Sequence, residues 1–542
     1  MSIRALIVAG TWCILMSLEA LGQGYKTELY IPGSGMHGIH GLTFDHEDRL
    51  FTGSVVGQSI YEVHPQTGQH RTYVGPPLGM ADDLEFSSDG TLFWTSFALG
   101  KVHAQKNFGP TREIASGLMG INSLAISADG RLFATQVFLG DALWELDPLG
   151  AAEPRKILEN MGGLNGFDFG PYGYLYGPLW FKGGVARVDV DSGELEVILD
   201  GFTVPAAANF DSKGNLWVLD SAEGHIVKVD VAKRTRVVFP GHPTAMDNLA
   251  FDSNDTLWFT VMAENAVYRF DPEKNESTAI RSDVFAQPCD VHIVKDGERE
   301  LMYVADNFAV KYVDLASMEI VSVARNVESH IEYPSGLYAN DKHLVLTSWF
   351  SNTLQILERK TGEPVASFAG VAGATDAIET DDGTIYVLRL NGSIQRVDGD
   401  TASAWPEVAR VEGGVAMAYT GDSTVYVASQ AGSITRVDLA TDEIKVVVEG
   451  LDAPEGLAMA PDGALIALET GKDAVTRVDA ATGASTTIGA GIPSQLGMPA
   501  FFPTAGPLSG LAVASDGAIY VTSDVEGSIY KLTPLADAAD SD

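Results

Sequence analysis

Residues with polar side chains recur about forty positions apart in the N-terminal half of the chain. Each stands just before a segment of the form Gly-Leu-x-Phe or a variant of it. The six positions are His40, Asp82, Asn122, Asn165, Ala206 and Asp247, of which only Ala206 is apolar. A fold that brings this set together would place two carboxylates, two amide oxygens and one imidazole at one point.

Oxygen donors of this kind suit Ca²⁺, which accepts roughly six to eight oxygen ligands and tolerates carboxylate, amide and water together. We therefore expect Asp82, Asn122, Asn165 and Asp247 to hold a divalent cation, with Ca²⁺ as the first choice. Zinc would require more His or Cys ligands than these positions offer. The same side chains could instead bind water and cap strand ends, as Asn and Asp often do in turns.

The elements that must position these residues follow from a repeat of about forty residues along the whole chain. Copies include GLTFDHEDRLFTGSVVGQSIYEVHPQTG from Gly41 and GLAMAPDGALIALETGKDAVTRVDAATG from Gly456. Apolar residues alternate within each copy, and D-G or T-G pairs separate the runs, which indicates antiparallel strands joined by tight turns. A repeat of this length predicts the blades of a β-propeller, whose inner strands begin near a central channel.

Twelve copies can be counted, and propellers usually have about four to eight blades. We therefore predict an all-β fold of two tandem six-bladed β-propellers, with a division into seven and five blades left open. The corresponding residues of the second ring are Cys289, Ser335, Thr375, Val415, Glu455 and Ser509. Only one of these is charged, so no second metal site is expected. Cys289 is expected to be buried, and Glu455 to be a solvated channel residue.

Ring closure requires a strand from one end of each ring to complete a blade, because an open ring leaves a sheet edge exposed. We expect KTELYI, residues 26–31, to close the first ring, and STAIRSDV from Ser277 to begin the second. The resulting domains are a signal peptide over 1–22, a first propeller over 23–275, a second propeller over 276–534 and an acidic tail over 535–542.

The first residues resemble an export signal. Arg4 precedes a mostly apolar run that ends near Met16, and Ala20 and Gly22 have the spacing that a signal peptidase accepts. The run is shorter than the roughly 20 residues that span a bilayer, so we predict cleavage rather than a membrane anchor. The mature protein is then expected in the periplasm or the medium, with Cys289 as its one cysteine and no internal disulfide.

The charge of the chain restricts its partners. The sequence has 72 acidic and 35 basic residues, which gives a formal net charge of −37. Such a surface repels nucleic acid and anionic lipid. We expect a small-molecule substrate, and leave a protein partner open.

The repeat and the polar positions resemble the SMP-30/gluconolactonase family, in which Asn and Asp side chains hold a central Ca²⁺. Asn165 in LNGFDFGPYGYLYG matches the family motif best, and Asn122 and Asp247 match by position. The chain departs from the family in its first blade, where His40 and Asp82 stand nearest to the place of a glutamate.

This resemblance implies an exported, calcium-dependent hydrolase that acts on a lactone or a related ester. In such an enzyme the metal polarises the carbonyl oxygen, while Asp247 or His40 activates water. These two are the candidate catalytic residues. His37 and His242, in loops expected on the same side, are the candidate substrate-binding residues.

Two other functions fit the same repeat. Phrases such as TLWFTVMAENAVYRFD also resemble virginiamycin B lyase, a C–O lyase, although the glutamate typical of that repeat is Val261 here and only one blade keeps it, as Glu469. Propellers of the NHL type share the same phrase without catalysis, so a binding scaffold is the non-enzymatic alternative.

One insertion interrupts the regular spacing. It contains GAGIPSQLGMPAFFPTAGP, residues 489–507, which is rich in Pro and Gly and carries Leu496, Met498, Phe501 and Phe502. Such a loop could be a lid, a contact between the rings or a binding edge, or it could fold back on its own blade.

Overall fold

The structure is a computed structural model that describes residues 21, 22, 24–329, 331–496 and 509–535. Within these residues the chain forms twelve antiparallel sheets, one for each copy of the repeat. The helical segments among them are single 3-10 turns: η1 (Phe97–Leu99), η2 (Pro171–Gly173), η3 (Met262–Glu264), η4 (Ala402–Ala404) and η5 (Thr470–Lys472). The predicted all-β class is confirmed.

The first six sheets, which we call blades 1 to 6, each consist of four consecutive strands. In chain order their strands are β3 (Ile39–Phe44), β4 (Leu50–Ser54), β5 (Ser59–Val63), β6 (His70–Val74); β7 (Leu84–Phe86), β8 (Thr91–Ser96), β9 (Lys101–Lys106), β10 (Arg112–Ala115); β11 (Ile121–Ile126), β12 (Leu132–Gln136), β13 (Ala142–Leu146), β14 (Arg155–Glu159); β15 (Asp168–Phe169), β16 (Leu175–Leu179), β17 (Gly184–Val188), β18 (Leu195–Asp200); β19 (Pro205–Phe210), β20 (Leu216–Asp220), β21 (His225–Asp230), β22 (Thr235–Phe239); β23 (Met246–Phe251), β24 (Leu257–Val261), β25 (Ala266–Asp271), β26 (Glu276–Arg281).

Blades 7 to 12 follow the same plan, except that the last one also takes strands from the N-terminal end. Their strands are β27 (Asp290–Asp296), β28 (Arg299–Asp306), β29 (Ala309–Asp314), β30 (Ile320–Arg325); β31 (Gly336–Ala339), β32 (His343–Ser348), β33 (Thr353–Glu358), β34 (Pro364–Ala369); β35 (Ala374–Glu379), β36 (Ile385–Arg389), β37 (Ser393–Arg396), β38 (Glu407–Arg410); β39 (Gly414–Tyr419), β40 (Thr424–Ser429), β41 (Ser433–Asp438), β42 (Glu443–Glu449); β43 (Pro454–Met459), β44 (Leu465–Glu469), β45 (Ala474–Val478), β46 (Ser485–Ala490); and β47 (Leu511–Val513), β48 (Ile519–Ser523), β49 (Ser528–Pro534) with β2 (Tyr25–Ile31) and β1 (Leu21–Gly22).

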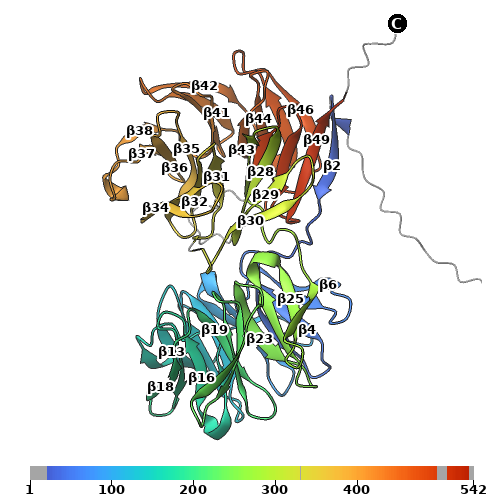
Figure 1. The fold of residues 1–542 in the computed structure, drawn as a ribbon, viewed down its shortest axis with the longest axis vertical. Coiled ribbons are helices and arrows are strands. Elements are labelled where there is room, and N and C mark those ends of the chain that lie inside the picture. The colour runs from blue at the N-terminus through green and yellow to red at the C-terminus, as the bar shows by residue number, and fades with distance from the viewer. Residues whose placement is uncertain (1–20, 23, 330, 497–508, 536–542) are drawn as a thin grey trace, which may run out of the picture.

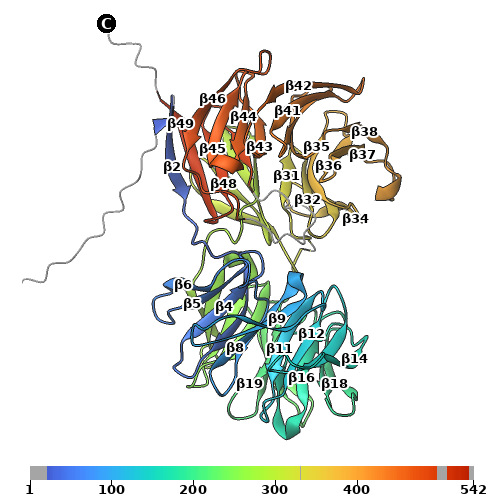
Figure 2. The ribbon, with the colours of Figure 1, turned by 180° about the vertical axis from the view of Figure 1, so that it is seen from behind.

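The blades close into two rings of six. The innermost strand of each blade contacts that of the next, and the cycle returns from β23 to β3 in one ring and from β47 to β27 in the other. Figures 1 and 2 show the two rings as separate bodies, one carrying most of the blue to green strands and the other the yellow to red strands together with the blue strand β2. We call them the first and the second propeller.

The predicted closing strands are wrong. β2, which contains residues 26–31, pairs with β49 and so completes blade 12 of the second propeller, not the first. The segment from Ser277 lies in β26, which pairs with β25 as the outer strand of blade 6. Blades 1 and 6 therefore have all four strands from consecutive residues, and the first propeller needs no strand from elsewhere. The first propeller is inserted into the second, between β2 and β27, and the predicted boundary at 275/276 falls at the start of β26.

Apolar side chains fill the spaces between neighbouring blades. Leu42 and Tyr61 of blade 1 pack against Trp258 and Val267 of blade 6, so the same kind of contact that joins consecutive blades also closes the first propeller. A single blade cannot cover both of its faces, and this packing supplies the cover.

Threonine hydroxyls tie the inner strands of adjacent blades together. Thr260 of blade 6 donates to the carbonyl of His40 in blade 1, and Thr95 of blade 2 donates to the carbonyl of Asn122 in blade 3. In the second propeller Thr522 of blade 12 donates to the carbonyl of Cys289 in blade 7 at 3.1 Å. These bonds fix the backbone of the residues that begin each inner strand, which include the candidate site residues.

Three of the predictions concern residues outside the described part of the chain. They are the signal peptide apart from Leu21 and Gly22, the acidic tail from residue 536, and Met498, Phe501 and Phe502 of the insertion. Among the described residues, no helix has the length and apolar character needed to cross a membrane. Cys289 is a free, buried cysteine, as predicted.

Candidate functional site

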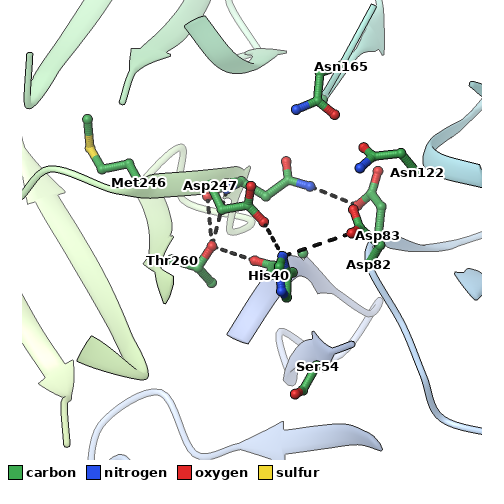
Figure 3. Close-up of polar contacts among 12 residues, drawn as sticks. His40, Ser54, Asp82, Asp83, Asn122, Asn165, Met246, Asp247 and Thr260 are labelled. Atoms are coloured by element: carbon green, nitrogen blue, oxygen red, sulfur yellow. Dashed lines mark hydrogen bonds and ion pairs between the residues drawn. The ribbon is translucent and has the colours of Figure 1, made fainter. Parts of the chain in front are cut away.

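The five polar residues among the six repeat positions of the first propeller meet at one end of its channel. Figure 3 shows the side chains of His40, Asp82, Asn122, Asn165 and Asp247 pointing toward a common centre. They come from blades 1, 2, 3, 4 and 6, and each lies near the start of an inner strand. His40, Asn122 and Asp247 are the second residues of β3, β11 and β23, and Asp82 and Asn165 lie shortly before β7 and β15. The convergence expected from ring closure therefore takes place.

The imidazole of His40 lies between two carboxylates. Its Nδ1 is 3.1 Å from Asp247 Oδ2 and 3.9 Å from Asp82 Oδ2. The side chains of His40, Asp82 and Asp247 are 11%, 12% and 14% exposed, respectively. The three groups are therefore mostly buried but keep some contact with solvent. An ionised Asp247 can only accept here, which assigns the hydrogen of a neutral imidazole to Nδ1 and leaves a lone pair on Nε2.

The two asparagines share a hydroxyl. Ser123 Oγ lies 2.8 Å from Asn122 Oδ1 and 2.9 Å from Asn165 Oδ1, and it accepts the backbone N–H of Gly166 at 2.7 Å. The two amide oxygens are thus held close together, with one serine between them.

Burial and charge act against each other in this cluster. Burial lowers the pKa of His40, but the hydrogen bond to Asp247 and the charges of Asp247 and Asp82 outweigh it, and the net pKa is raised. Burial raises the pKa of Asp82 to about 7, and the charges of Asp247 and Asp83 add to the rise while His40 opposes it. The site is therefore a buried region in which two carboxylates face a single imidazole.

The negative charge and the oxygen donors of this cluster suit a hard cation, but the number of charged ligands is small. Two carboxylates and two amide oxygens face one centre, and a cation would offset the charges of Asp247 and Asp83, which add to the larger effect of burial in raising the pKa of Asp82. Among the described residues, however, no three His, Cys, Asp or Glu side chains gather closely enough to hold a metal. A metal here would depend on the amide oxygens of Asn122 and Asn165, as Ca²⁺ does and Zn²⁺ does not.

The two remaining predicted residues lie apart from the cluster. Both ring nitrogens of His242 have partners at the outer edge of blade 6, with Nε2 3.1 Å from Asn275 Oδ1 and Nδ1 2.8 Å from Ser277 Oγ. His37 lies in the segment between β2 and β3 and is 2% exposed, and burial lowers its pKa to about 4. Neither position suits a residue that meets substrate at the centre.

Residues 40–305 match the family model described as the SMP-30/gluconolactonase/LRE-like region. The match starts at the candidate catalytic histidine, covers the first propeller from there and ends in β28 of the second. The first propeller is SMP-30/gluconolactonase-like. The resemblance predicted from the sequence is confirmed.

Solved structures similar to this chain include propellers of several kinds. Virginiamycin B lyase from Staphylococcus aureus is 16% identical over 51% of this chain and 95% of its own, with a TM-score of 0.38. A protein provisionally described as a gluconolactonase is 17% identical over 44% of this chain and 89% of its own, at 0.36. An extracellular domain of a proposed one-component system from B. thetaiotaomicron is 10% identical over 95% of this chain and 74% of its own, at 0.36. No curated protein shows significant sequence similarity to the chain.

Sequence reasoning missed a second layer of polar residues just behind the site of the gluconolactonase-like propeller. Asp83 accepts the backbone N–H of Leu84 at 2.9 Å and that of Leu124, in the next blade, at 3.0 Å. Asn248 donates to Asp83 at 3.0 Å. Asp83 directly follows Asp82 in the chain, and Asn248 directly follows Asp247. A second polar residue after the candidate site residue was therefore a sequence signal that could have predicted this layer.

The second propeller has the same arrangement, in which one carboxylate accepts backbone N–H groups from two adjacent blades. These carboxylates surround a cavity of about 250 Å³. Asp376 accepts the backbone N–H of Ala377 at 2.7 Å and that of Met417, in the next blade, at 2.6 Å. Asp290 likewise binds the N–H groups of Val291 and Leu337 at 2.8 and 2.9 Å. These carboxylates line the cavity, but their hydrogen bonds join blades, which is a structural role.

Asp168 in the first propeller also accepts N–H groups from two blades, from Phe169 at 2.7 Å and from Phe210 at 3.1 Å. Such interblade carboxyls predict an unusual dependence of the free energy of unfolding on pH. Burial raises the pKa of Asp376 to about 7 and that of Asp168 to about 6, although backbone N–H groups oppose the rise. The folded protein therefore holds protons that the unfolded chain has lost, and this stabilising effect is complete below the unfolded pKa of 3.8 and disappears as the pH rises through 6 to 7. For Asp168 alone the rise from 3.8 to about 6 corresponds to about 3 kcal/mol.

We expect the free energy of unfolding, measured by urea titration in EDTA, to be lower at about pH 8 than at about pH 5. Asp168→Asn should flatten this dependence, whereas Asp341→Asn, at an exposed position, should leave it unchanged. A free energy of unfolding that increases between these two pH values would contradict the assignment.

Proposed function

We propose that this protein is an exported, calcium-dependent hydrolase that opens a lactone or a related ester at the channel end of the first propeller. The observation that supports this is the pairing of His40 with Asp247, at 3.1 Å, inside a centre where oxygen donors from blades 2, 3 and 4 converge. The match of residues 40–305 to a family that includes gluconolactonases agrees with it.

His40 and Asp247 can act as a base and its orienting partner. Asp247 accepts the Nδ1 hydrogen and holds the ring, so Nε2 can take a proton from an attacking water. The carboxylates raise the pKa of His40, and this increases the strength of the base in spite of burial. Once protonated, the imidazolium is balanced by Asp247 and Asp82, and Nε2 can return the proton to the departing alkoxide of the opened ester.

Asp82, Asn122, Asn165 and the remaining oxygen of Asp247 are the residues that would hold Ca²⁺. A bound Ca²⁺ would polarise the carbonyl of the ester and offset the negative charge that develops on its oxygen. The enclosed position of these side chains keeps competing water away from the bound ester.

Export is part of the proposal. Arg4, the apolar run that follows and the small residues at 20 and 22 favour a cleaved signal, and the strongly acidic surface favours solubility outside the cytoplasm. Cell fractionation of the expressed chain, with N-terminal sequencing of the mature protein, tests this part separately.

Calcium is expected to stabilise the first propeller. A ligand present at about 100 times its dissociation constant adds about 2.7 kcal/mol, so Ca²⁺ should raise the melting temperature and EDTA should reverse the change. Mg²⁺, which prefers a smaller octahedral site with several waters, should have a weaker effect.

Asp82→Asn and Asn165→Ala should reduce this calcium effect, and Asp341→Asn should keep it. An unchanged melting temperature in Ca²⁺ and in EDTA would exclude the metal. If lactones were still hydrolysed in EDTA, the reaction would have to be catalysed by His40 and Asp247 without a metal.

A further inference from the structure

The end of the first propeller that carries the site faces the second propeller. Phe350, which follows β32, packs with Val55 and Met80, in connections between strands of the first propeller, and with Phe97 of η1. Polar contacts lie beside it: Arg325 pairs with Glu264 at 2.8 Å, and Thr244 donates to Glu328 at 2.8 Å. Loops of the second propeller therefore cover the site end of the first.

Phe308 of the second propeller reaches the catalytic histidine directly. Its ring centroid is 5.8 Å from that of His40 in an edge-on arrangement, and the side chain is 1% exposed. The backbone of Gly38 lies against the same ring, because a Cβ at this residue would come within 2.0 Å of Phe308 Cε2. Phe308 thus contacts Gly38, which precedes β3, and His40, which lies in β3, and it limits the orientations open to the imidazole.

Tyr333 continues the aromatic surface from Phe308. The two rings are 5.8 Å apart, and Phe350 follows at 5.5 Å from Tyr333. Burial raises the pKa of the Tyr333 phenol above its usual value, and the charges of Asp247 and Asp82 add to the rise, so this side chain is within electrostatic reach of the site. Tyr333 and Phe350 are half-buried, unlike Phe308, and are accordingly the members of the row that a ligand can touch.

We propose that Phe308, Tyr333 and Phe350 of the second propeller form an aromatic wall of the first propeller's site and select esters or lactones with an apolar substituent. This inference rests on the proposed hydrolase activity. Phe308 lies against His40, and Tyr333 and Phe350 continue the row of aromatic rings from it. A hydrocarbon chain would bury its surface against the rings, whereas the hydroxyls of a sugar lactone would lose water there without gaining partners.

The roles within the wall differ. Tyr333 and Phe350 would contact the apolar part of the substrate. Phe308 is a positioning residue, because it acts through the ring of His40. The second propeller would then be required for selectivity, although the first carries all of the polar site residues.

The test uses the full-length chain and two substrates with the same ring, γ-butyrolactone and γ-nonalactone, which carries a pentyl chain. We expect wild-type protein to have a KM for γ-nonalactone that is lower by about tenfold or more. Tyr333→Ala should remove most of this preference by raising the KM for γ-nonalactone more than its kcat falls, and Tyr333→Phe should restore it. Tyr172→Ala is the matched control, because Tyr172 also has a positive φ, of 71° against 48° for Tyr333, but is 94% exposed.

Binding of the corresponding lactam, 5-pentylpyrrolidin-2-one, measured by calorimetry, separates this inference from the proposed function. Lactam binding that weakens in Tyr333→Ala while no lactone is hydrolysed would support the wall and overturn the hydrolase. Hydrolysis with an unchanged ratio of the two KM values in Tyr333→Ala would overturn the wall and keep the hydrolase. Absence of both lactam binding and hydrolysis in wild-type protein would overturn both.

Discussion

Deletion of residues 25–31 is expected to unfold the second propeller while the first remains folded. These residues form β2, which pairs with β49 along six residue positions and joins the two ends of the second ring. Without it, blade 12 keeps three strands and exposes the edge of β49, and Ile31, which is 4% exposed in the intact protein, is lost from the core beside Phe285 and Ile529.

The size of this effect follows from the bonds and surface that are lost. Hydrogen bonds contribute about 1 kcal/mol each on balance, so a strand with several of them contributes a few kcal/mol before apolar burial is added. Whole domains are stable by only about 5 to 15 kcal/mol. The deletion therefore removes a large part of the stability of the second propeller, and the newly exposed edge favours aggregation.

Hydrogen exchange followed by mass spectrometry distinguishes the two propellers. Protection should be lost first in β47, β48 and β49, while β23 to β26 stay protected because they complete their own ring. A synthetic peptide with the sequence of residues 24–32 should restore protection to the truncated chain, and a scrambled peptide should not. Loss of protection in blades 1 and 6 before blade 12 would contradict this topology.

The number of blades could be predicted from the sequence because each blade repeats the same alternation and turns. The position of His40, Asp82, Asn122, Asn165 and Asp247 followed from it, since closing a ring brings the starts of all inner strands to one end. No contact between specific side chains had to be known for this step.

The choice of closing strand could not be predicted in the same way. KTELYI has the alternation of a propeller strand and fits the edge of either ring. The decisive fact is that β26 supplies the fourth strand of blade 6, which leaves β49 as the edge that still needs a partner. A local pattern carries no information about which of two equivalent edges is already occupied.

The aromatic wall was also beyond sequence reasoning. Phe308 and Tyr333 lie in loops of the second propeller, and their places in the repeat have no fixed role. Phe308 contacts His40, and Tyr333 contacts Phe308, only because the two propellers face each other, which depends on the segment between β2 and β3 and on contacts such as Arg325 with Glu264. His242 lies away from the cluster for the related reason that its side chain contacts Asn275 and Ser277 at the outer strand of blade 6.

Asp247→Asn is expected to reduce kcat by roughly 10² to 10⁴, the usual range for the loss of acid–base catalysis. The amide has nearly the same shape, so the fold should be kept, but it lacks the charge that stabilises a protonated His40. Initial rates with a lactone, measured at saturating substrate, give this effect. Asp271→Asn, in the same blade but at the exposed ion pair with Lys274, is the matched control and should retain the wild-type rate.

His40→Gln should lower kcat to a similar extent, and the double variant shows whether the two residues act as one unit. If Asp247 works by holding and balancing His40, removing both should cost little more than removing either, because each single variant already disables the pair. Reductions that multiply in the double variant would instead mean that Asp247 acts separately, as a metal ligand alone. Single variants that keep more than about half of the rate would exclude this pair from the chemistry, since an acid–base group at the reaction contributes far more than a factor of two.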